Sequence, residues 1–211
     1  ALSAATKISN SLDGNLALII AVPYQHLVDQ CADDVKDFGQ NPIRAYRSRE
    51  QWQPRLEREI MEFNMGSRSS LVVITTHTTF ASDPFQRSLD RIAREEKMVI
   101  ADEVHHLGAP HLQTGLPTDI ALRLGLSATP VRWYDEEGTK VLFDYFGDGV
   151  VFEYGLKEAI ASGALCEYYY VPHIVELNDE EAETYITLSK TIGRLASQAE
   201  GDLSDADLQE N

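Results

Sequence analysis

Four short, mostly apolar runs constrain the fold of this chain more strongly than any other feature of its sequence. They lie at residues 16–22 (LALIIAV), 71–75 (LVVIT), 98–101 (MVIA) and 121–126 (ALRLGL). Runs of this length, bounded by polar residues, are typical of strands that are covered on both faces. Between the runs, apolar residues three and four apart predict helices at residues 24–38, 54–64 (beginning at Pro54) and 84–96. Strands that alternate with helices indicate an α/β fold with a mostly parallel central sheet.

The sequence changes character after residue 154. We expect a short strand at residues 150–154, a helix at 156–162 closed by Gly163, an extended aromatic segment at 168–177, and a helix at 179–198 with Asn178 as N-cap. The acidic residues 201–211 are expected to be mobile. We therefore expect a main domain at residues 1–172, followed by a connector strand, a helix and an acidic tail at residues 173–211.

The net charge of −16 is unevenly distributed along the chain. Residues 176–211 hold ten acidic and two basic residues, so half of the excess lies in this last part. A local basic cluster has the opposite character and comprises Arg44, Arg47, Arg49, Arg55 and Arg58, with Trp52 among them. Because local charge decides where a phosphate backbone can lie, the cluster predicts either a nucleic-acid contact or a solvated helix face.

The sequence shows no sign of a membrane or secretory segment. No apolar run approaches the roughly 18 residues of a membrane span, and residues 1–15 lack the basic start and apolar core of a signal peptide. Cys31 and Cys166 form no CxxC motif, so we interpret them as buried structural cysteines. We expect an intracellular protein with reduced thiols and no membrane partner.

Two adjacent carboxylates, Asp102 and Glu103, directly follow the third apolar run. Open α/β sheets bind their ligands at the carboxyl ends of the strands, where these acids are expected to lie. Neighbouring side chains of an extended segment point in different directions, so one acid can hold a metal ion while the other faces a reacting water. The pair therefore favours a nucleotide hydrolase, and the alternative is a solvated turn.

Right-handed crossovers bring the carboxyl ends of parallel strands to one edge of a sheet. We expect polar segments to converge there from residues 23–30, 75–79, 102–106 and 127–129. Three histidines near the acids, His105, His106 and His111, raise the question of a zinc site. The HExxH spacing that places two histidines on one helix face is absent, so we favour loop or surface positions for His106 and His111.

Asp102-Glu103-Val104-His105 and Ser127-Ala128-Thr129-Pro130, each at a predicted strand end, resemble motifs II and III of a superfamily 2 DExH-box helicase. Residues 22–30 (VPYQHLVDQ) look like motif Ia, and residues 74–77 (ITTH) look like the Ib/Ic region. Residues 154–160, with Gly163 and Leu165, resemble the segment that leaves the first lobe in excision-repair helicases and type III restriction motor (Res) subunits. The resemblance covers most of the chain and implies a RecA-like three-layer sandwich with a C-terminal helical extension.

The resemblance implies a role for each motif residue. Asp102 would hold Mg²⁺, Glu103 would orient and deprotonate the attacking water, and His105 would sense the γ-phosphate of ATP. Motif III, which consists of Ser127, Ala128 and Thr129, would couple the nucleotide state to the grip on nucleic acid. Mg²⁺ prefers carboxylate and water oxygens, and phosphoryl transfer needs a positioned water, so the chemistry of the two acids agrees with these roles.

The same resemblance implies nucleic-acid contacts by Pro23, Gln25 and Gln30 of motif Ia, and by Thr75 and Thr76 at the next strand end. Backbone amides and hydroxyls at such loops suit phosphate contacts that read no sequence. Thr75 and Thr76 can equally be β-branched residues of the strand itself.

The phosphate-binding loop of these helicases, G-x-x-x-x-G-K-[ST], does not occur in the sequence. Its place would be before residues 16–22, and residues 1–12 look like the helix that follows it. Lys7 has no preceding glycines and cannot replace the loop lysine. We therefore expect a truncated first lobe that binds ATP weakly and hydrolyses it negligibly by itself.

The expected parent protein is an ATP-dependent helicase or translocase with a second RecA-like lobe. It would use ATP and Mg²⁺ and act on nucleic acid, with duplex DNA favoured, in repair or in restriction. The alternative is a non-catalytic lobe that serves as a nucleotide- or DNA-binding scaffold. An intact glycine-rich loop upstream in the parent gene would exclude the scaffold.

Overall fold

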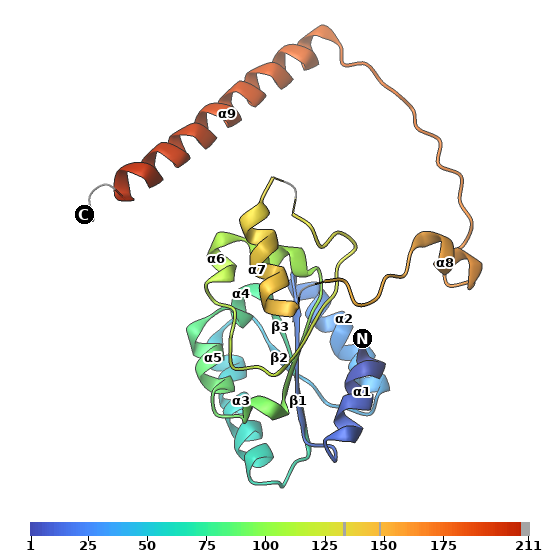
Figure 1. Cartoon of the computed structure of the whole chain (residues 1–211), viewed down its shortest axis with the longest axis vertical. Coiled ribbons are helices and arrows are strands. Elements are labelled where there is room, and N and C mark those ends of the chain that lie inside the picture. Colours follow the sequence, from blue (N-terminus) through green and yellow to red (C-terminus); the bar gives the residue numbers. More distant parts are fainter. Residues whose placement is uncertain (133, 148, 208–211) are drawn as a thin grey trace. The chain divides into compact units, whose positions relative to one another are not determined.

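The computed structural model describes residues 1–132, 134–147 and 149–207, with side chains described up to residue 195. The chain divides by contacts into two compact units, Ala1–Val151 and Phe152–Asn211 (Figure 1). This division falls earlier in the chain than the domain boundary expected after residue 172. The expected boundary stays a prediction. No helix in the described part of the chain is long and apolar enough to span a membrane.

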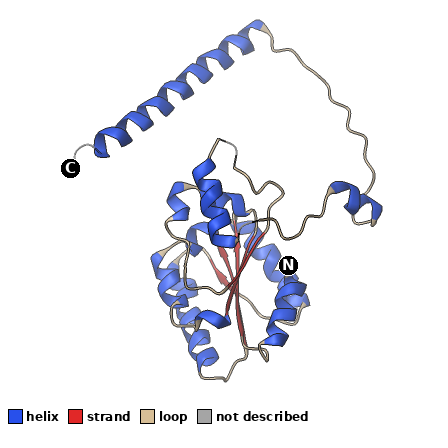
Figure 2. Ribbon diagram, in the orientation of Figure 1, coloured by secondary structure: helices blue, strands red, loops and turns tan. Residues whose placement is uncertain are grey.

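A five-stranded sheet in the order β2-β3-β1-β4-β5 forms the centre of the first unit (Figure 2). The strands are β1 (Leu16–Val22), β2 (Ile43–Ala45), β3 (Ser70–Thr76), β4 (Lys97–Ala101) and β5 (Leu122–Gly125). All four pairs of neighbours are parallel, which confirms the predicted α/β class. Strand β2 was not predicted, because its three residues, with an exposed arginine in the middle, form no apolar run.

Strand β1 shows why the sheet is covered on both faces. All seven of its residues are buried, and successive side chains point to opposite faces. Ala17, Ile19 and Ala21 pack in one hydrophobic cluster with α3, α5 and α7. Leu18, Ile20 and Val22 pack in a second cluster with α1 and α2. The result is the predicted three-layer arrangement.

The helices that cover the sheet have the following bounds. They are α1 (Leu2–Ser11), α2 (Gln25–Asp37), α3 (Arg49–Asn64), α4 (His77–Phe80), α5 (Asp83–Leu89), α6 (Pro110–Gln113) and α7 (Glu136–Phe146), with 3-10 turns η1 (Arg94–Glu96) and η2 (Val104–Gly108). Helices α4, α6 and α7 and turn η2 were not predicted. The two hydrophobic clusters place α1 and α2 on one face of the sheet and α3, α5 and α7 on the other (Figure 1).

Three predicted elements differ from the structure. Helix α3 begins at Arg49 rather than at Pro54, because Trp52 is buried together with Leu56 and extends the apolar face toward the N-terminus. The helix expected at residues 84–96 ends at Leu89, whose carbonyl accepts a hydrogen bond from the buried Lys97 Nζ at 3.3 Å. No strand forms at residues 150–154, where Val150 and Val151 are exposed.

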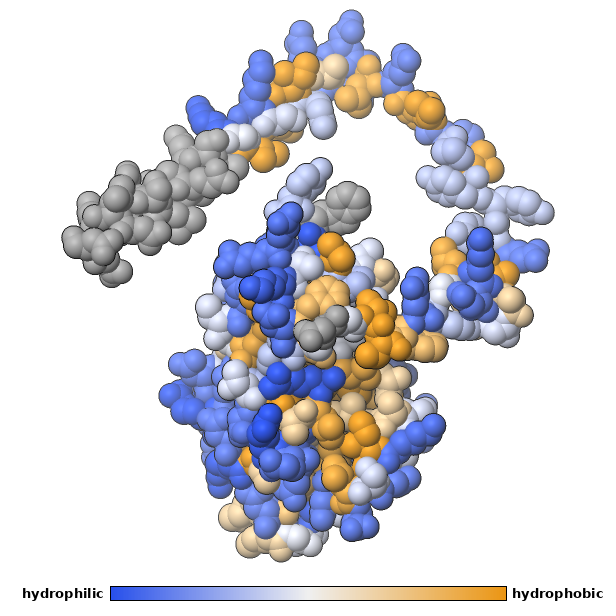
Figure 3. All heavy atoms as spheres, in the orientation of Figure 1, coloured by the Kyte–Doolittle hydropathy of each residue, from blue (hydrophilic) through white to orange (hydrophobic). Residues whose placement is uncertain are grey.

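The second unit contains helices α8 (Leu156–Ala161) and α9 (Asp179–Asp207). Asn178 is the predicted N-cap of α9, since its Oδ1 accepts from the Glu181 N–H at 2.9 Å. Residues 201–207, expected to be mobile, belong to α9, and residues 208–211 lie outside the described residues. Apolar side chains three and four apart are exposed along α9 (Figure 3) and include Tyr185, Leu188, Ile192 and Leu195. Cys166 is exposed and Cys31 only partly buried, so the prediction of two buried cysteines is wrong.

Candidate functional site

Motif II is tied by backbone hydrogen bonds to both strands that flank the end of β4. The N–H of Asp102 donates to the Ala21 carbonyl of β1 at 2.9 Å. On the other side, the N–H of Val104 donates to the Leu126 carbonyl at 2.9 Å, just after β5. The acid pair is therefore held between the ends of β1 and β5, at the carboxyl edge of the sheet.

Glu103 has a left-handed backbone conformation, with φ 45° and ψ 49°. This conformation costs a residue with a Cβ roughly 1–2 kcal/mol, and such strain is typical of functional sites. It ends the extended segment at Asp102 and starts turn η2. The expectation that both acids lie on an extended segment is therefore wrong, because the chain turns at the second one.

Motifs II and III are in direct contact. Nδ1 of His105 lies 3.0 Å from Oγ of Ser127 and 3.4 Å from Oε2 of Glu103. The Ser127 hydroxyl also accepts from the N–H of Thr129 at 3.1 Å. The structure thus joins four of the predicted residues in one polar chain, while Ala128 is exposed beside it.

Arg132, which follows motif III in the sequence, fixes the backbone of motif II. Its Nη1 donates to the His105 carbonyl, and its Nε lies 2.6 Å from Oδ2 of Asp135. Asp135 is in turn the N-cap of α7 and accepts from the Gly138 N–H at 2.8 Å. Sequence reasoning missed Arg132, although the Asp-x-x-Gly cap that orients it is visible in the sequence.

Turn η2 and helix α7 approach each other at two glycines. A Cβ on Gly108 would lie 2.7 Å from the Gly138 carbonyl oxygen and 2.7 Å from Cδ of Arg132. A Cβ on Gly138 would lie 2.6 Å from the Gly108 carbonyl oxygen. Both distances are below any ordinary contact, so the position of η2 depends on the absence of side chains there.

His77, the first residue of α4, binds the backbone of Asp102. Its Nε2 lies 2.9 Å from the Asp102 carbonyl oxygen, and its side chain is buried at 3% exposure. A carbonyl only accepts, so Nε2 carries the proton. Burial lowers the pKa of His77 to about 4, so the ring is neutral at pH 7. Sequence reasoning placed His77 in the Ib/Ic region but gave it no role.

The residues predicted to contact nucleic acid fall into two groups. Pro23 is half-buried and Gln25 exposed at the carboxyl end of β1, while the exposed Gln30 lies further along α2. Thr75 is fully buried and donates its hydroxyl to the Ala45 carbonyl at 2.7 Å. Thr76 Oγ1 accepts from the Thr79 N–H at 3.3 Å and caps α4. The Thr75 hydroxyl is engaged inside the sheet and the Thr76 hydroxyl donates to Thr79 Oγ1 at 3.2 Å, so contact of these two residues with a phosphate stays a prediction.

The basic cluster is largely neutralised by acids. Nε of Arg44 lies 3.4 Å from Asp29, and Nε of Arg55 lies 2.7 Å from Glu59. Trp52 is buried and packs edge-on against Phe85, with ring centroids 5.7 Å apart. These contacts favour the solvated helix face over the nucleic-acid contact.

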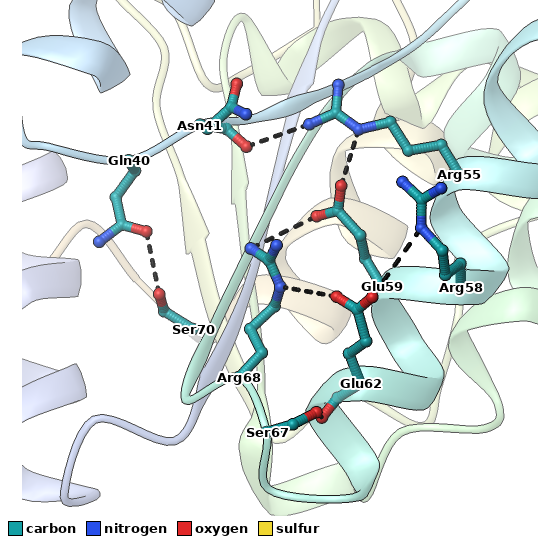
Figure 4. A network of polar contacts seen from close by, with 9 residues as sticks. All are labelled: Gln40, Asn41, Arg55, Arg58, Glu59, Glu62, Ser67, Arg68 and Ser70. Atoms are coloured by element: carbon teal, nitrogen blue, oxygen red, sulfur yellow. Dashed lines mark hydrogen bonds and ion pairs between the residues drawn. The ribbon is translucent and has the colours of Figure 1, made fainter.

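Glu59 is the centre of an ion network at the amino end of the sheet (Figure 4). It is buried at 4% exposure and pairs with Arg55 at 2.7 Å and with Arg68 at 3.5 Å. Arg68 also lies 3.6 Å from Glu62, and Arg55 donates to the Asn41 carbonyl at 3.4 Å. This network lies far along the strands from motif II.

The donor set at motif II fits magnesium better than zinc. Among the described residues, no group of three or more His, Cys, Asp and Glu side chains could hold a metal ion. The rings of His105 and His106 are packed at 4.4 Å between centroids, and His111 is exposed on α6. Mg²⁺ takes one or two carboxylates and completes its shell with waters and phosphates. The partly exposed Asp102 carboxylate makes no hydrogen bond or ion pair within the described ranges and suits that role.

Two relatives of this chain are helicase and restriction proteins. The putative DNA 3'-5' helicase Rad25 of Haloarcula marismortui is 29% identical over 113 residues, which are 50% of this chain and 18% of the relative. One solved structure that resembles this chain is a nuclease-deletion mutant of the type ISP restriction-modification enzyme LlaGI in complex with a DNA substrate mimic. It matches with a TM-score of 0.56 at 16% identity, over 77% of this chain and 17% of that chain. At this identity the match confirms the RecA-like fold alone.

The chain spans less than a fifth of the length of both relatives. The match to the helicase and the order of the motifs confirm the resemblance to a first lobe of superfamily 2 helicases. A family model described as the type III restriction enzyme res subunit matches residues 1–132, more than half of the chain. This chain therefore belongs to the ResIII family, as a helicase-type first lobe related to repair and restriction enzymes.

Proposed function

We propose that this lobe is part of an ATP-dependent helicase or translocase that couples Mg-ATP hydrolysis to the remodelling of duplex DNA. The observation that carries the proposal is the contact of His105 with both Ser127 and Glu103. It links a strained acid at the carboxyl edge to the next strand end, as a device that senses a nucleotide would require. The relatives point to DNA, since one is named a DNA helicase and the other was solved with a DNA mimic.

The two acids would divide the chemistry. Asp102 would hold Mg²⁺, which neutralises the charge of the β- and γ-phosphates when it is bound. Glu103 would accept a proton from the attacking water, and its half-exposed carboxylate is accessible for this. His105 would orient Glu103 and transmit the state of the γ-phosphate through Ser127 to Thr129.

Nucleic-acid contact is proposed for the exposed part of the carboxyl edge. Pro23, Gln25 and Gln30 stay candidates because their side chains are at least partly accessible. Thr75 and Thr76 act there through structure, since one hydroxyl joins β3 to β2 and the other caps α4.

The proposal includes partners beyond these 211 residues, namely a phosphate-binding loop and a second RecA-like lobe. The sequence contains no G-x-x-x-x-G-K-[ST] loop, and such a loop supplies the amides and the lysine that cradle the phosphates. We therefore expect the purified chain to bind ATP weakly and to turn it over negligibly. Robust magnesium-dependent turnover by this chain would contradict the expectation.

The test is Glu103→Gln in the full-length parent protein. We expect kcat for ATP hydrolysis to fall by about 10²–10⁴-fold, the usual contribution of a general base, with little change in KM for ATP. Glu95→Gln is the control, because Glu95 is an exposed acid in η1. Unchanged turnover of the Glu103→Gln protein would refute the proposed role.

One alternative is a non-catalytic lobe that serves as a scaffold for nucleotide or DNA. The two functions differ in the parent protein. A scaffold would show the same low ATP turnover with Glu103 as with glutamine in its place. The presence or absence of a nuclease domain in the parent protein, together with the DNA substrates it acts on, would distinguish a role in restriction from a role in repair.

A further inference from the structure

His77 bridges the ends of two strands that are not neighbours in the sheet. The sheet order places β1 between β3 and β4. His77 directly follows β3, Asp102 directly follows β4, and the register pairs both strand ends with the end of β1. The Nε2–O distance of 2.9 Å between His77 and Asp102 therefore spans the end of β1.

The bridge holds one particular peptide group. The carbonyl of Asp102 and the N–H of Glu103 belong to the same planar peptide. Rotation of this plane changes ψ of Asp102 and φ of Glu103 together. Since Glu103 has a left-handed φ of 45°, the plane is in an orientation that its own sterics oppose. A hydrogen bond to the carbonyl opposes its return to an ordinary orientation.

The contact is also buried and specific. His77 is 3% exposed, and among the described residues the Asp102 carbonyl accepts no backbone hydrogen bond. The ring therefore satisfies a carbonyl that would otherwise lack a partner inside the protein. Breaking this contact would free the plane and leave that oxygen unpaired.

We propose that His77 is a positioning residue that fixes the peptide plane between Asp102 and Glu103, and thereby the relative orientation of the two carboxylates. The inference rests on the proposed function, because the two carboxylates act together only in a magnesium-dependent hydrolase. His77 itself touches neither substrate nor metal. Its effect is expected on kcat rather than on ATP binding, because misplaced groups cost most in the reacting geometry.

The test compares His77→Leu, which removes the donor, with His77→Gln, whose amide nitrogen can reach a similar position. In the full-length parent protein, His77→Leu should lower kcat for ATP hydrolysis on the order of tenfold to a hundredfold, with KM for ATP within about twofold. His77→Gln should recover most of the loss. Tyr145→Phe is the matched control, because it removes another side-chain bond to a carbonyl, Tyr145 to Pro117 at 2.9 Å, on a different element.

Hydrogen exchange of the same proteins gives a readout that needs no turnover. We expect faster amide exchange in the peptide covering residues 102–106 for His77→Leu, and near wild-type exchange for His77→Gln and Tyr145→Phe. An unchanged kcat in an active protein, or unchanged exchange at residues 102–106, would overturn the role of His77. If the wild-type protein hydrolyses no ATP while exchange responds as expected, the proposed function fails and the structural bridge stands.

Discussion

The two ends of the same parallel sheet differ in how their charged groups are paired and in how strained their backbone is. At the amino end, Glu59 is buried between Arg55 and Arg68, and the buried Lys97 pairs with Asp119 at 2.7 Å. At the carboxyl end, Glu103 has a strained backbone conformation. Charged groups are paired at one end, whereas the other end has a strained backbone at Glu103 and, within the described residues, an Asp102 carboxylate without a hydrogen bond or ion pair.

Stability and activity should therefore depend on different ends of the sheet. Substitutions at the amino end should change the free energy of unfolding and leave the chemistry alone. Substitutions at the carboxyl end should change activity, and some should even stabilise the fold. Four experiments probe the two ends, in order of decreasing expected effect.

The largest effect is expected from Arg55→Met combined with Arg68→Met, which leaves the buried Glu59 carboxylate without a cation. Removing the partners of a buried charge costs about 3–5 kcal/mol in the free energy of unfolding. Urea unfolding of the chain measures it. Adding Glu59→Leu should restore most of the loss, because an apolar replacement removes the buried charge as well. A double variant as stable as wild type would show that Glu59 is held by something other than these arginines.

Acid should weaken the carboxyl end through His77. Its pKa is lowered from 6.5 to about 4 in the folded protein, so the unfolded chain takes up a proton at a higher pH than the folded one. This contribution to stability is therefore complete above about pH 6.5 and is lost as the pH falls toward 4, by about 3 kcal/mol in total. Urea unfolding at pH 7 and pH 4.5 should show a smaller drop for His77→Leu than for wild type. Equal drops would place the acid sensitivity elsewhere.

Gly108→Ala should press turn η2 away from α7. The new methyl would lie 2.7 Å from the Gly138 carbonyl, and overpacking of this kind costs about 1–3 kcal/mol. Thermal unfolding measures the loss. Gly149→Ala is the control, since nothing lies within 4 Å of a Cβ at that position. Equal melting temperatures for the two variants would mean that the turn and the helix separate at no cost.

The smallest effect has the opposite sign. Glycine adopts left-handed backbone angles without strain, so Glu103→Gly should be more stable than Glu103→Ala by about 1 kcal/mol. Both variants lack the carboxylate, so both should lose ATP turnover in the parent protein. Chemical unfolding of the pair isolates the backbone contribution. If alanine were as stable as glycine here, the strain at Glu103 would be negligible, and the contrast between the two ends would be weaker.

Most of the sheet could be predicted from the sequence, because β1, β3 and β4 are apolar runs of strand length. The contact of motif II with motif III also follows from the order of the strands. Thr75 shows why the burial of some site residues could not be predicted. Its hydroxyl is consumed by Ala45 of β2, a three-residue strand with no apolar run of its own, so the burial of Thr75 could not be seen without β2. The left-handed turn at Glu103 and the reach of His77 are likewise properties of the folded backbone and leave no periodic pattern.

The central place of β1 in the sheet has a consequence for the order of synthesis. The ribosome makes β1 before both of its partners, and β3 follows only after α2, β2 and α3. The seven residues of β1 therefore stay unpaired until these elements have been synthesised. All seven are apolar and are buried in the folded protein. Non-local parallel pairing is slow, and an exposed apolar strand favours aggregation. During translation, the strand at the centre of the finished sheet is thus an aggregation-prone segment until β3 and β4 have been made.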